Sequence, residues 1–344
     1  MSSHSGVTRC RRTVGDGMRV TPSQDERDLA AMCRSVLAAE LEPDAQWKAL
    51  ADAGILGLPL DGSLTDVGVF CVEAGRSLCP RVVQSTVYAA LAIEWLGAGS
   101  EWLPRLTSGE ARGTIALFDP RDAANGRRVN GVAQFVADAD QADVIVTSTD
   151  AGVVAIDTMA SGITIEPVQM MGGFSASTVH FDDVMVDTPV PVDAEQLRRV
   201  ANAVVALDCL DLVGVGEAVI ARTVDYTKMR EQFGRPIASF QAAQHLVANM
   251  HIALSAARLA AQSAVFWIGQ GRTATRETAI ARMRAAEVKR ITLDAHQLHG
   301  GMGYVVDTGL HKFSERARIV STLGGGADIA ATWLEDEMNW QGKR

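Results

Sequence analysis

The sequence is poor in aromatic side chains and in long apolar runs. Phe, Trp and Tyr make up 5% of the 344 residues, although hydrophobic residues make up 47% and charged residues 21%. A large core must therefore consist mostly of Ala, Val, Leu and Ile, which favours helices and excludes a mainly disordered chain. We find no apolar stretch of the roughly 18–20 residues that span a bilayer, so no membrane segment is expected.

Basic runs and paired cysteines are also missing. Formal net charge is -9, with 41 Asp and Glu against 32 Lys and Arg, which makes a nucleic-acid partner unexpected. The five cysteines form no C-x-x-C pair and suggest neither a disulfide framework nor a metal site; they are Cys10, Cys33, Cys71, Cys79 and Cys209. These features predict a reduced, cytoplasmic protein without a metal.

Composition divides the chain into four segments. Residues 1–17 are polar and Arg-bearing, and we expect a disordered leader there, with Met1 and Met18 as alternative start sites. The other segments predict an N-terminal helical domain, a small antiparallel β domain and a C-terminal four-helix bundle, over residues 18–112, 113–195 and 196–344. The expected fold class is α+β, mostly α.

Local patterns place several elements within these segments. Ser23 is a predicted helix N-cap, and further helices are expected over residues 64–79 and 84–97. Residues 238–270 are apolar almost all round, which predicts a helix buried among others, and the next helix covers about 275–298. Short β-branched runs begin at Thr114, Val144, Val153 and Ile163, and Asn130-Gly131 predicts a hairpin turn.

Two short segments of the C-terminal region stand out. The first reads R-E-Q-F-G-R-P-I over residues 230–237, where Gly234 and Pro236 force a turn between two long helices. The second reads Q-L-H-G-G-M-G-Y over residues 297–304, and its glycines let a backbone approach a ligand closely and offer N–H donors to an anion. Each segment alone also fits an ordinary helix connection or a glycine helix stop.

In this order, the two segments resemble the acyl-CoA dehydrogenase family, which carries an R-x-x-F-G-x-P-I loop and then a Q-x-x-G-G-x-G-Y turn. The W-K-A-L and G-I-L-G-L-P stretches within residues 47–59 and the V-H-F-D-D-V stretch at 179–184 also resemble that family. The resemblance covers roughly residues 24–340. It implies α,β-desaturation of an acyl-CoA: a carboxylate removes the α-proton, FAD takes the β-hydrogen as hydride, and an electron-transfer flavoprotein-type acceptor follows.

The resemblance also implies a shared cofactor site. In the family's tetramers, the Arg loop and the glycine turn contact the adenine-diphosphate half of the FAD bound to a neighbouring subunit. The corresponding cofactor-binding residues here would be Arg230, Gln232, Phe233, Phe240, Gln241, Gln297, Gly300 and Gly301. The forked, permanently charged guanidinium of Arg230 suits a pyrophosphate.

The family's catalytic base has no counterpart. The Glu of its Y-E-G-T-x-x-I segment falls at Gly324, and the alternative base position, on the helix before the Arg loop, falls at Val204. Asp208 and Asp211 follow one and two turns after Val204, and Asp328 follows one turn after Gly324. We interpret these three as ordinary helix carboxylates, with Asp208 as the substitute base if the chain is catalytic.

The segments that would cradle the chain's own flavin ring are reduced. Residues 116–120 resemble the start of the family's T-E-P-x-A-G-S-D segment, but no A-G-S-D follows. Asn130-Gly131 comes only ten residues after Pro120, which predicts that the intervening strand is deleted, and Ala137 replaces the family's flavin-facing Thr.

These departures favour one interpretation: the base-less subunit of an α2β2 heterotetramer, similar to the bacterial heteromeric acyl-CoA dehydrogenases used on steroid side chains. The chain would complete the FAD site of a catalytic partner that binds the acyl-CoA. Three alternatives stay open, namely an active homo-oligomer with Asp208 as base, a purely structural subunit, and a flavin monooxygenase on the same fold.

Overall fold

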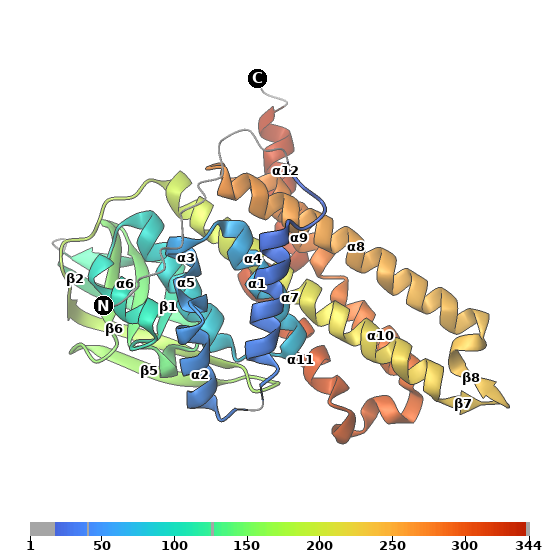
Figure 1. Ribbon diagram of the computed structural model, residues 1–344. Coiled ribbons are helices and arrows are strands. Elements are labelled where there is room, and N and C mark those ends of the chain that lie inside the picture. The colour runs from blue at the N-terminus through green and yellow to red at the C-terminus, as the bar shows by residue number, and fades with distance from the viewer. Residues whose placement is uncertain (1–17, 40, 125–126, 342–344) are drawn as a thin grey trace, which may run out of the picture.

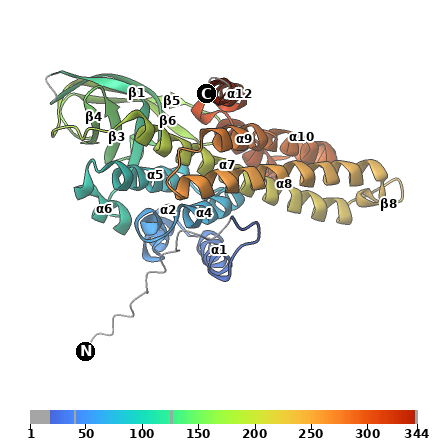
Figure 2. The same ribbon diagram turned by 90° about the horizontal axis from the view of Figure 1, so that it is seen from above.

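The computed structural model describes residues 18–39, 41–124 and 127–341, so the predicted leader at 1–17 lies outside the described residues. Figure 1 shows the N-terminal helices and the β-sheet on one side and the long C-terminal helices on the other. Seen from above in Figure 2, the sheet and the N-terminal helices form two layers that meet the start of the C-terminal bundle. The predicted α+β, mostly helical fold is confirmed.

Two of the N-terminal helices begin at a capping side chain that the sequence supplies. The hydroxyl of Ser23 accepts from the N–H of Glu26 at 3.2 Å, and the Glu26 carboxylate accepts from the N–H of Ser23 at 2.7 Å. This reciprocal pair satisfies two N–H groups that a helix start otherwise leaves open. Ser63 and Asp66 repeat the arrangement. The helices are α1 (Gln24–Leu37), α2 (Pro43–Asp52), α3 (Leu58–Asp61), α4 (Leu64–Ser77), α5 (Arg81–Leu96) and α6 (Leu103–Ser108).

The sheet is mixed, whereas the sequence predicted a sheet that is antiparallel throughout. Its strand order is β4-β3-β1-β2-β6-β5, and β1 pairs parallel with β3, with Gly113 opposite Val144. The other pairings are antiparallel. The strands are β1 (Gly113–Ala124), β2 (Arg128–Ala137), β3 (Val144–Thr149), β4 (Gly152–Asp157), β5 (Ile163–Gln169) and β6 (Ser175–Met185).

The hairpin turn predicted at Asn130-Gly131 is wrong. Both residues lie inside β2, where Asn130 pairs with Asp122 and the register against β6 shifts between Val129 and Gly131. Gly131 has φ +130°, so it supplies a bulge conformation that other residues rarely adopt. An Asn-Gly pair fits a bulge as well as a turn. The two residues before it already belong to β2, and no pattern in the sequence indicates that. β1 and β2 are neighbours in the sheet and pair directly. The sheet therefore has no space between them for the strand whose deletion the sequence predicted.

The C-terminal region consists of long helices, shown in Figure 1 from yellow to red. The central α7 crosses α4 at two glycines: a Cβ added at Gly75 would lie 1.9 Å from the Asp211 carbonyl oxygen, and one at Gly214 would lie 1.9 Å from the Val72 carbonyl oxygen. The predicted helix over 275–298 is interrupted after Ala285. The helices are α7 (Ala194–Met229), α8 (Gln241–Gly269), α9 (Thr275–Ala285), α10 (Val288–His299), α11 (Leu310–Val320) and α12 (Gly326–Gln341).

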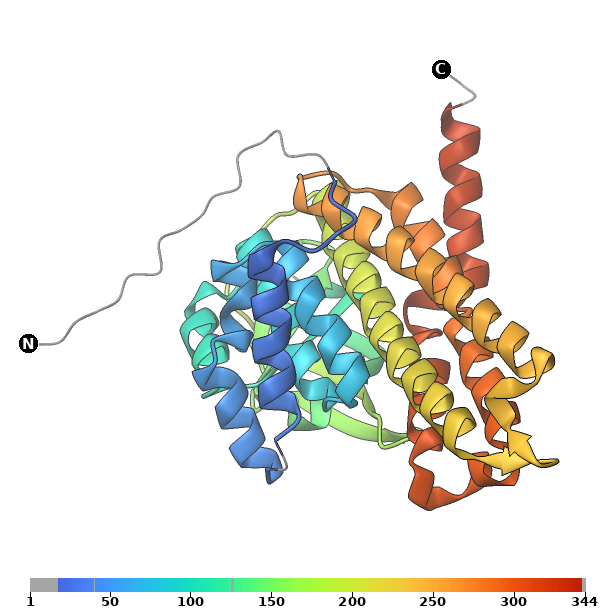
Figure 3. The ribbon, with the colours of Figure 1, turned by 45° about the vertical axis from the view of Figure 1, so that its right-hand side comes forward.

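Helix α8 departs from the prediction in two ways. It is not buried on every side, because Ile252 is 68% exposed and Leu259 43% exposed. Figure 3 shows α8 on the outer side of the bundle, beside α7. By length and composition α8 is also apolar enough to cross a membrane, contrary to the expectation that no stretch would be. Buried core helices of soluble proteins meet the same criterion, so this property alone is weak support for a membrane segment.

Candidate functional site

The two segments singled out in the sequence lie at the same end of the helical bundle. The Arg loop joins α7 to α8, and the glycine turn follows α10. The ring of Tyr226, in the last turn of α7, stacks on His299 at the end of α10, with 4.3 Å between ring centroids. The Tyr226 hydroxyl also donates to the His299 carbonyl oxygen at 3.4 Å. These contacts hold the two segments together.

The Arg loop is a tight β-hairpin between two helices. β7 (Glu231–Gln232) pairs with β8 (Arg235–Pro236) across a two-residue loop, Phe233-Gly234. Both loop residues have positive φ, +54° and +77°, as a type I′ turn requires. This conformation is unfavourable for a bulky residue, and the Phe233 ring is nevertheless 94% exposed. An exposed apolar ring held in a costly backbone conformation is typical of a binding element.

The other predicted cofactor residues of this segment are close to Phe233. Phe240 meets it edge to face at 6.3 Å, and the Arg235 guanidinium lies 4.1 Å over the Phe240 ring. Arg230 is the exposed C-cap residue of α7, and Gln232 and Gln241 are also exposed. The described contacts leave the Arg230 guanidinium without an ion pair. The hairpin therefore presents a cation, an amide and the Phe233 ring outward, whereas Phe240 is half-buried against the core.

The glycine turn is held in place by His296 on one side and is open at Gly300 and Gly301 on the other. His296 Nδ1 lies 2.8 Å from the Gly303 carbonyl oxygen, its Nε2 lies 2.7 Å from the Ser314 hydroxyl, and its ring stacks with Tyr304. A Cβ added at Gly300 or Gly301 would have no described atom within 4 Å. Gln297 is exposed beside them. The turn therefore leaves room for a ligand against its backbone.

Neither of the two possible base positions holds a titratable group, and Gly324 lies against α7 next to the residue that follows Val204. A Cβ added at Gly324 would lie 3.1 Å from Cγ2 of Val205, the neighbour of Val204 on α7. Gly324 has φ +66°, in the left-handed region, so a glutamate there would be strained as well as crowded. Asp328 is exposed in the first turn of α12.

Asp208, one turn after Val204, is committed to a buried ion pair. Its Oδ1 accepts from Arg81 Nη1 and from the Tyr88 hydroxyl, each at 3.0 Å. The side chains of Arg81 and Asp208 are 7% and 5% exposed. Burial alone would lower the pKa of Arg81, but the Asp208 carboxylate raises it above the ordinary arginine value, so the guanidinium stays charged. Burial also raises the pKa of Tyr88, which keeps its hydroxyl a donor.

A second buried network continues from Asp211. Arg316 donates through Nε and Nη2 to the two Asp211 oxygens at 3.0 and 2.6 Å, and through Nη1 to the Cys79 carbonyl oxygen at 2.6 Å. Gln84 donates to Asp211 and accepts from Arg316. Both carboxylates are thus bound by fixed donors, as structural groups are, and this favours the interpretation of Asp208 and Asp211 as structural residues.

No local sequence pattern indicates the partners of these carboxylates. Arg81 and Asp208 are 127 positions apart in the chain, and Arg316 and Asp211 are 105 apart. Asp138 was also missed: it is buried in the left-handed conformation at φ +52°, accepts from the Ser85 hydroxyl at 2.6 Å, and burial raises its pKa. The residue preceding it, Ala137, accepts at its carbonyl from the Thr114 hydroxyl at 2.6 Å. The side chains of residues 118–126 lie outside the described part.

The C-terminal half matches the sequence profile described as "Acyl-CoA dehydrogenase, C-terminal domain" over residues 205–338. This match begins within α7, ends within α12 and includes both segments at the exposed end. Over these residues, the chain is similar to the acyl-CoA dehydrogenase family.

Individual relatives and structures agree over most of the chain. Acyl-CoA dehydrogenase FadE28 of Mycobacterium tuberculosis is 28% identical over 334 residues, which cover 90% of this chain and 96% of FadE28. A variant of the Tcur3481-Tcur3483 steroid ACAD superposes with a TM-score of 0.84 and 25% identity, covering 93% of this chain and 99% of the other. The ChsE4-ChsE5 complex from Mycobacterium tuberculosis has a TM-score of 0.83 at 24% identity, covering 94% and 99%, and shares the fold.

Proposed function

We propose that this chain is the non-catalytic subunit of a heteromeric acyl-CoA dehydrogenase, and that it completes the FAD site of a catalytic partner. One observation carries the proposal. The residues that family members give to a neighbour's cofactor are present and exposed at one end, whereas both base positions, Gly324 and Val204, lack a proton acceptor. A homo-oligomer needs both halves of the site in one chain, but a mixed complex does not.

The exposed end fits the adenine-diphosphate half of FAD. Arg230 offers a charge for the pyrophosphate, Gly300 and Gly301 leave open space beside backbone N–H groups, and Phe233 and Phe240 offer apolar surface. When bound, FAD supplies the oxidising half of the desaturation by taking the β-hydrogen as hydride. The role left to this chain is to hold the cofactor's distal half, and the proton is removed by a carboxylate of the partner.

The relatives support the choice of a mixed complex. Two of the similar structures are each named after two chains. They are the ChsE4-ChsE5 complex and the Tcur3481-Tcur3483 enzyme, and the Tcur3481-Tcur3483 enzyme is a steroid ACAD. We therefore propose an α2β2 assembly in the cytoplasm that acts on an acyl-CoA of the steroid side-chain class and passes electrons to an electron-transfer flavoprotein-type acceptor.

The decisive experiment compares the chain alone with the chain co-expressed with a full-motif acyl-CoA dehydrogenase encoded beside it. We expect no bound flavin and no turnover from the single chain, and a yellow, active heteromer from the pair. A yellow, active homo-oligomer would refute the proposal and favour Asp208 as base. A partner whose flavin content and turnover do not depend on this chain would make the chain a structural subunit.

A further inference from the structure

The side chain of His296 joins three elements next to the glycine turn. It belongs to the last turn of α10, and its two ring nitrogens contact two other segments. Nδ1 lies 2.8 Å from the carbonyl oxygen of Gly303 in the turn, and Nε2 lies 2.7 Å from the hydroxyl of Ser314 on α11. His296 is 8% exposed, and the ring of Tyr304 stacks on it at 5.3 Å. A buried ring with both nitrogens bonded is held in one orientation.

The partners of the two nitrogens determine where the ring carries its proton. A backbone carbonyl oxygen can only accept a hydrogen bond, so the bond to Gly303 requires the proton on Nδ1. Nε2 is then an acceptor in the neutral ring and takes the hydrogen of the Ser314 hydroxyl. His296 is therefore a donor toward the glycine turn and an acceptor toward α11.

Helix α11 is itself fixed in the buried core. Two residues after Ser314, Arg316 is 4% exposed and donates to both carboxylate oxygens of Asp211 on α7. Contacts of fixed geometry thus lead from α7 through α11 to His296, and from His296 to Gly303. The glycine turn is tied to the most buried part of the bundle by one imidazole.

The turn needs such a support because its own backbone has great freedom. Three of the five residues of Gly300–Tyr304 are glycine. Gly300 has φ +55° and ψ -135°, a conformation that only glycine adopts readily. Because glycine loses more conformational freedom on ordering than any other residue, a turn of this composition binds a ligand tightly only if contacts within the protein already hold it.

Gly303 approaches His296 so closely that no side chain fits between them. A Cβ added at Gly303 would lie 2.9 Å from the His296 carbonyl oxygen and 3.2 Å from its Nδ1. By contrast, a Cβ added at Gly300 or Gly301 would have no described atom within 4 Å. The turn is therefore fixed at Gly303, and its two other glycines face open space.

Resting on the proposed function, in which Gly300 and Gly301 meet the partner's FAD, we propose that His296 is a positioning residue for that cofactor. Its Nδ1–H bond to Gly303 keeps the turn in the shape that leaves the backbone at Gly300 and Gly301 open to the ligand. Without this bond, FAD must order the turn as it binds, which lowers the affinity.

The test replaces His296 with Asn and with Gln in the complex with the catalytic partner. The Asn amide can take the place of Nδ1 and keep the bond to Gly303, whereas the Gln amide takes the place of Nε2 beside Ser314. FAD is titrated into each flavin-free complex, and its dissociation constant is read from flavin fluorescence. We expect Gln to weaken FAD binding about 10- to 100-fold, as for a lost hydrogen bond that leaves its partner unsatisfied, and Asn to stay within about threefold of wild type.

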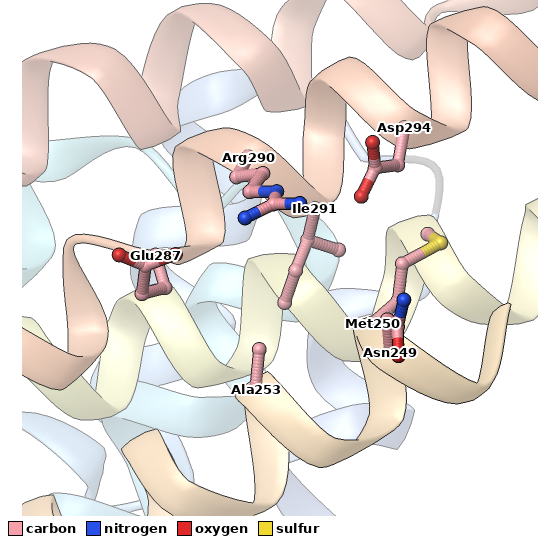
Figure 4. A pocket seen from close by; sticks show the side chains of 7 residues that line it. All are labelled: Asn249, Met250, Ala253, Glu287, Arg290, Ile291 and Asp294. Atoms are coloured by element: carbon pink, nitrogen blue, oxygen red, sulfur yellow. The ribbon is translucent and has the colours of Figure 1, made fainter. Parts of the chain in front are cut away.

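Two controls are matched to these variants. Ser314→Ala removes the bond to Nε2 and leaves the one to Gly303, so FAD affinity should change by less than about threefold. Asp294→Asn alters the same helix where Asp294 lines a cavity of about 230 Å³ against α8, as Figure 4 shows, and should leave FAD affinity unchanged. A merely structural role for His296 predicts the opposite order of the two amides, because Asn is the poorer helix former.

Each other outcome overturns the inference. If Asn weakens FAD binding as much as Gln or more, His296 acts through the packing of α10 and not through Gly303. If neither amide weakens it, the turn keeps its shape without the bond. Circular dichroism shows whether each variant keeps its helices. Should a His296 variant not fold, Gly303→Ala replaces it: the added Cβ forces the turn away from His296, so the same loss is expected, and unchanged FAD affinity overturns the inference.

Two further measurements separate this inference from the proposed function. A wild-type complex that binds no FAD, or an Arg230→Ala complex with unchanged FAD affinity, refutes the proposed function and the role of His296 with it. A loss of FAD affinity in Arg230→Ala without any loss in the His296 variants refutes only the positioning role.

Discussion

The buried pair of Arg81 and Asp208 allows a direct distinction between a structural carboxylate and a catalytic one. Replacing Asp208 with Leu leaves the Arg81 guanidinium almost fully buried without a counter-ion, since Nη1 loses its acceptor at 3.0 Å and Nε already has none among the described atoms. We expect the free energy of unfolding to fall by about 3–5 kcal/mol, as for a buried pair with one partner removed.

Removing both charges should restore most of that loss. In Arg81→Met with Asp208→Leu, apolar side chains of similar length replace the pair, and such exchanges are often neutral in stability. The Tyr88 hydroxyl loses its acceptor in this variant, but Cys71 Sγ remains 3.8 Å away. Because this cancellation depends on direct contact between the two residues, the two single changes should not add.

The assay is thermal unfolding of the assembled complex together with turnover of an acyl-CoA. If Asp208 is structural, Asp208→Asn and the double variant both keep turnover within about threefold of wild type. Removing Arg81 can restore the stability lost with Asp208, but it cannot restore a missing catalytic base. A loss of about 1000-fold or more in the double variant, with FAD still bound, would therefore refute the argument and identify Asp208 as the base.

Three further predictions concern the exposed end, the base position and a buried acid. Arg230→Ala should weaken FAD retention in the complex by about 2–5 kcal/mol, because a pyrophosphate charge loses its partner in the assembled site; Arg272→Ala, at the other end of α8, should leave flavin content unchanged. Gly324→Glu should produce no turnover from the single chain and should lower stability by about 1 kcal/mol or more, given φ +66° and the contact with Val205; measurable desaturation would contradict this. Asp138→Asn should stabilise the protein at neutral pH, because burial raises the pKa of Asp138 in the folded state above the 3.8 of the unfolded chain. The advantage should grow from about pH 4 upward and vanish below it, and unfolding midpoints that show no such trend would contradict the assignment.

Much of the fold follows from local patterns. The caps at Ser23 and Ser63 and the β-branched runs at Thr114 and Val144 identify helices and strands by interactions within a few residues. Where a pattern serves two structures, prediction was wrong: Asn130-Gly131 suits a turn and a bulge equally, and only pairing with β6 selects the bulge. The parallel pairing of β1 and β3 likewise depends on strands 31 positions apart.

The sequence by itself determined the chemical content of the site. Because glycine and valine cannot accept a proton, no catalytic base can act at Gly324 or Val204 in any conformation. The two motifs of the Arg loop and the glycine turn are visible in the order of their residues. Only the tertiary structure decided what the remaining acids do: Asp208 and Asp211 are paired by residues more than 100 positions away. The same holds for α8, whose apolar composition predicted burial on every side, whereas packing in this chain covers one side and leaves Ile252 and Leu259 open. The positions of apolar residues in a helix predict how much apolar surface it has, but only the packing of the other helices determines which part of that surface is buried within the chain.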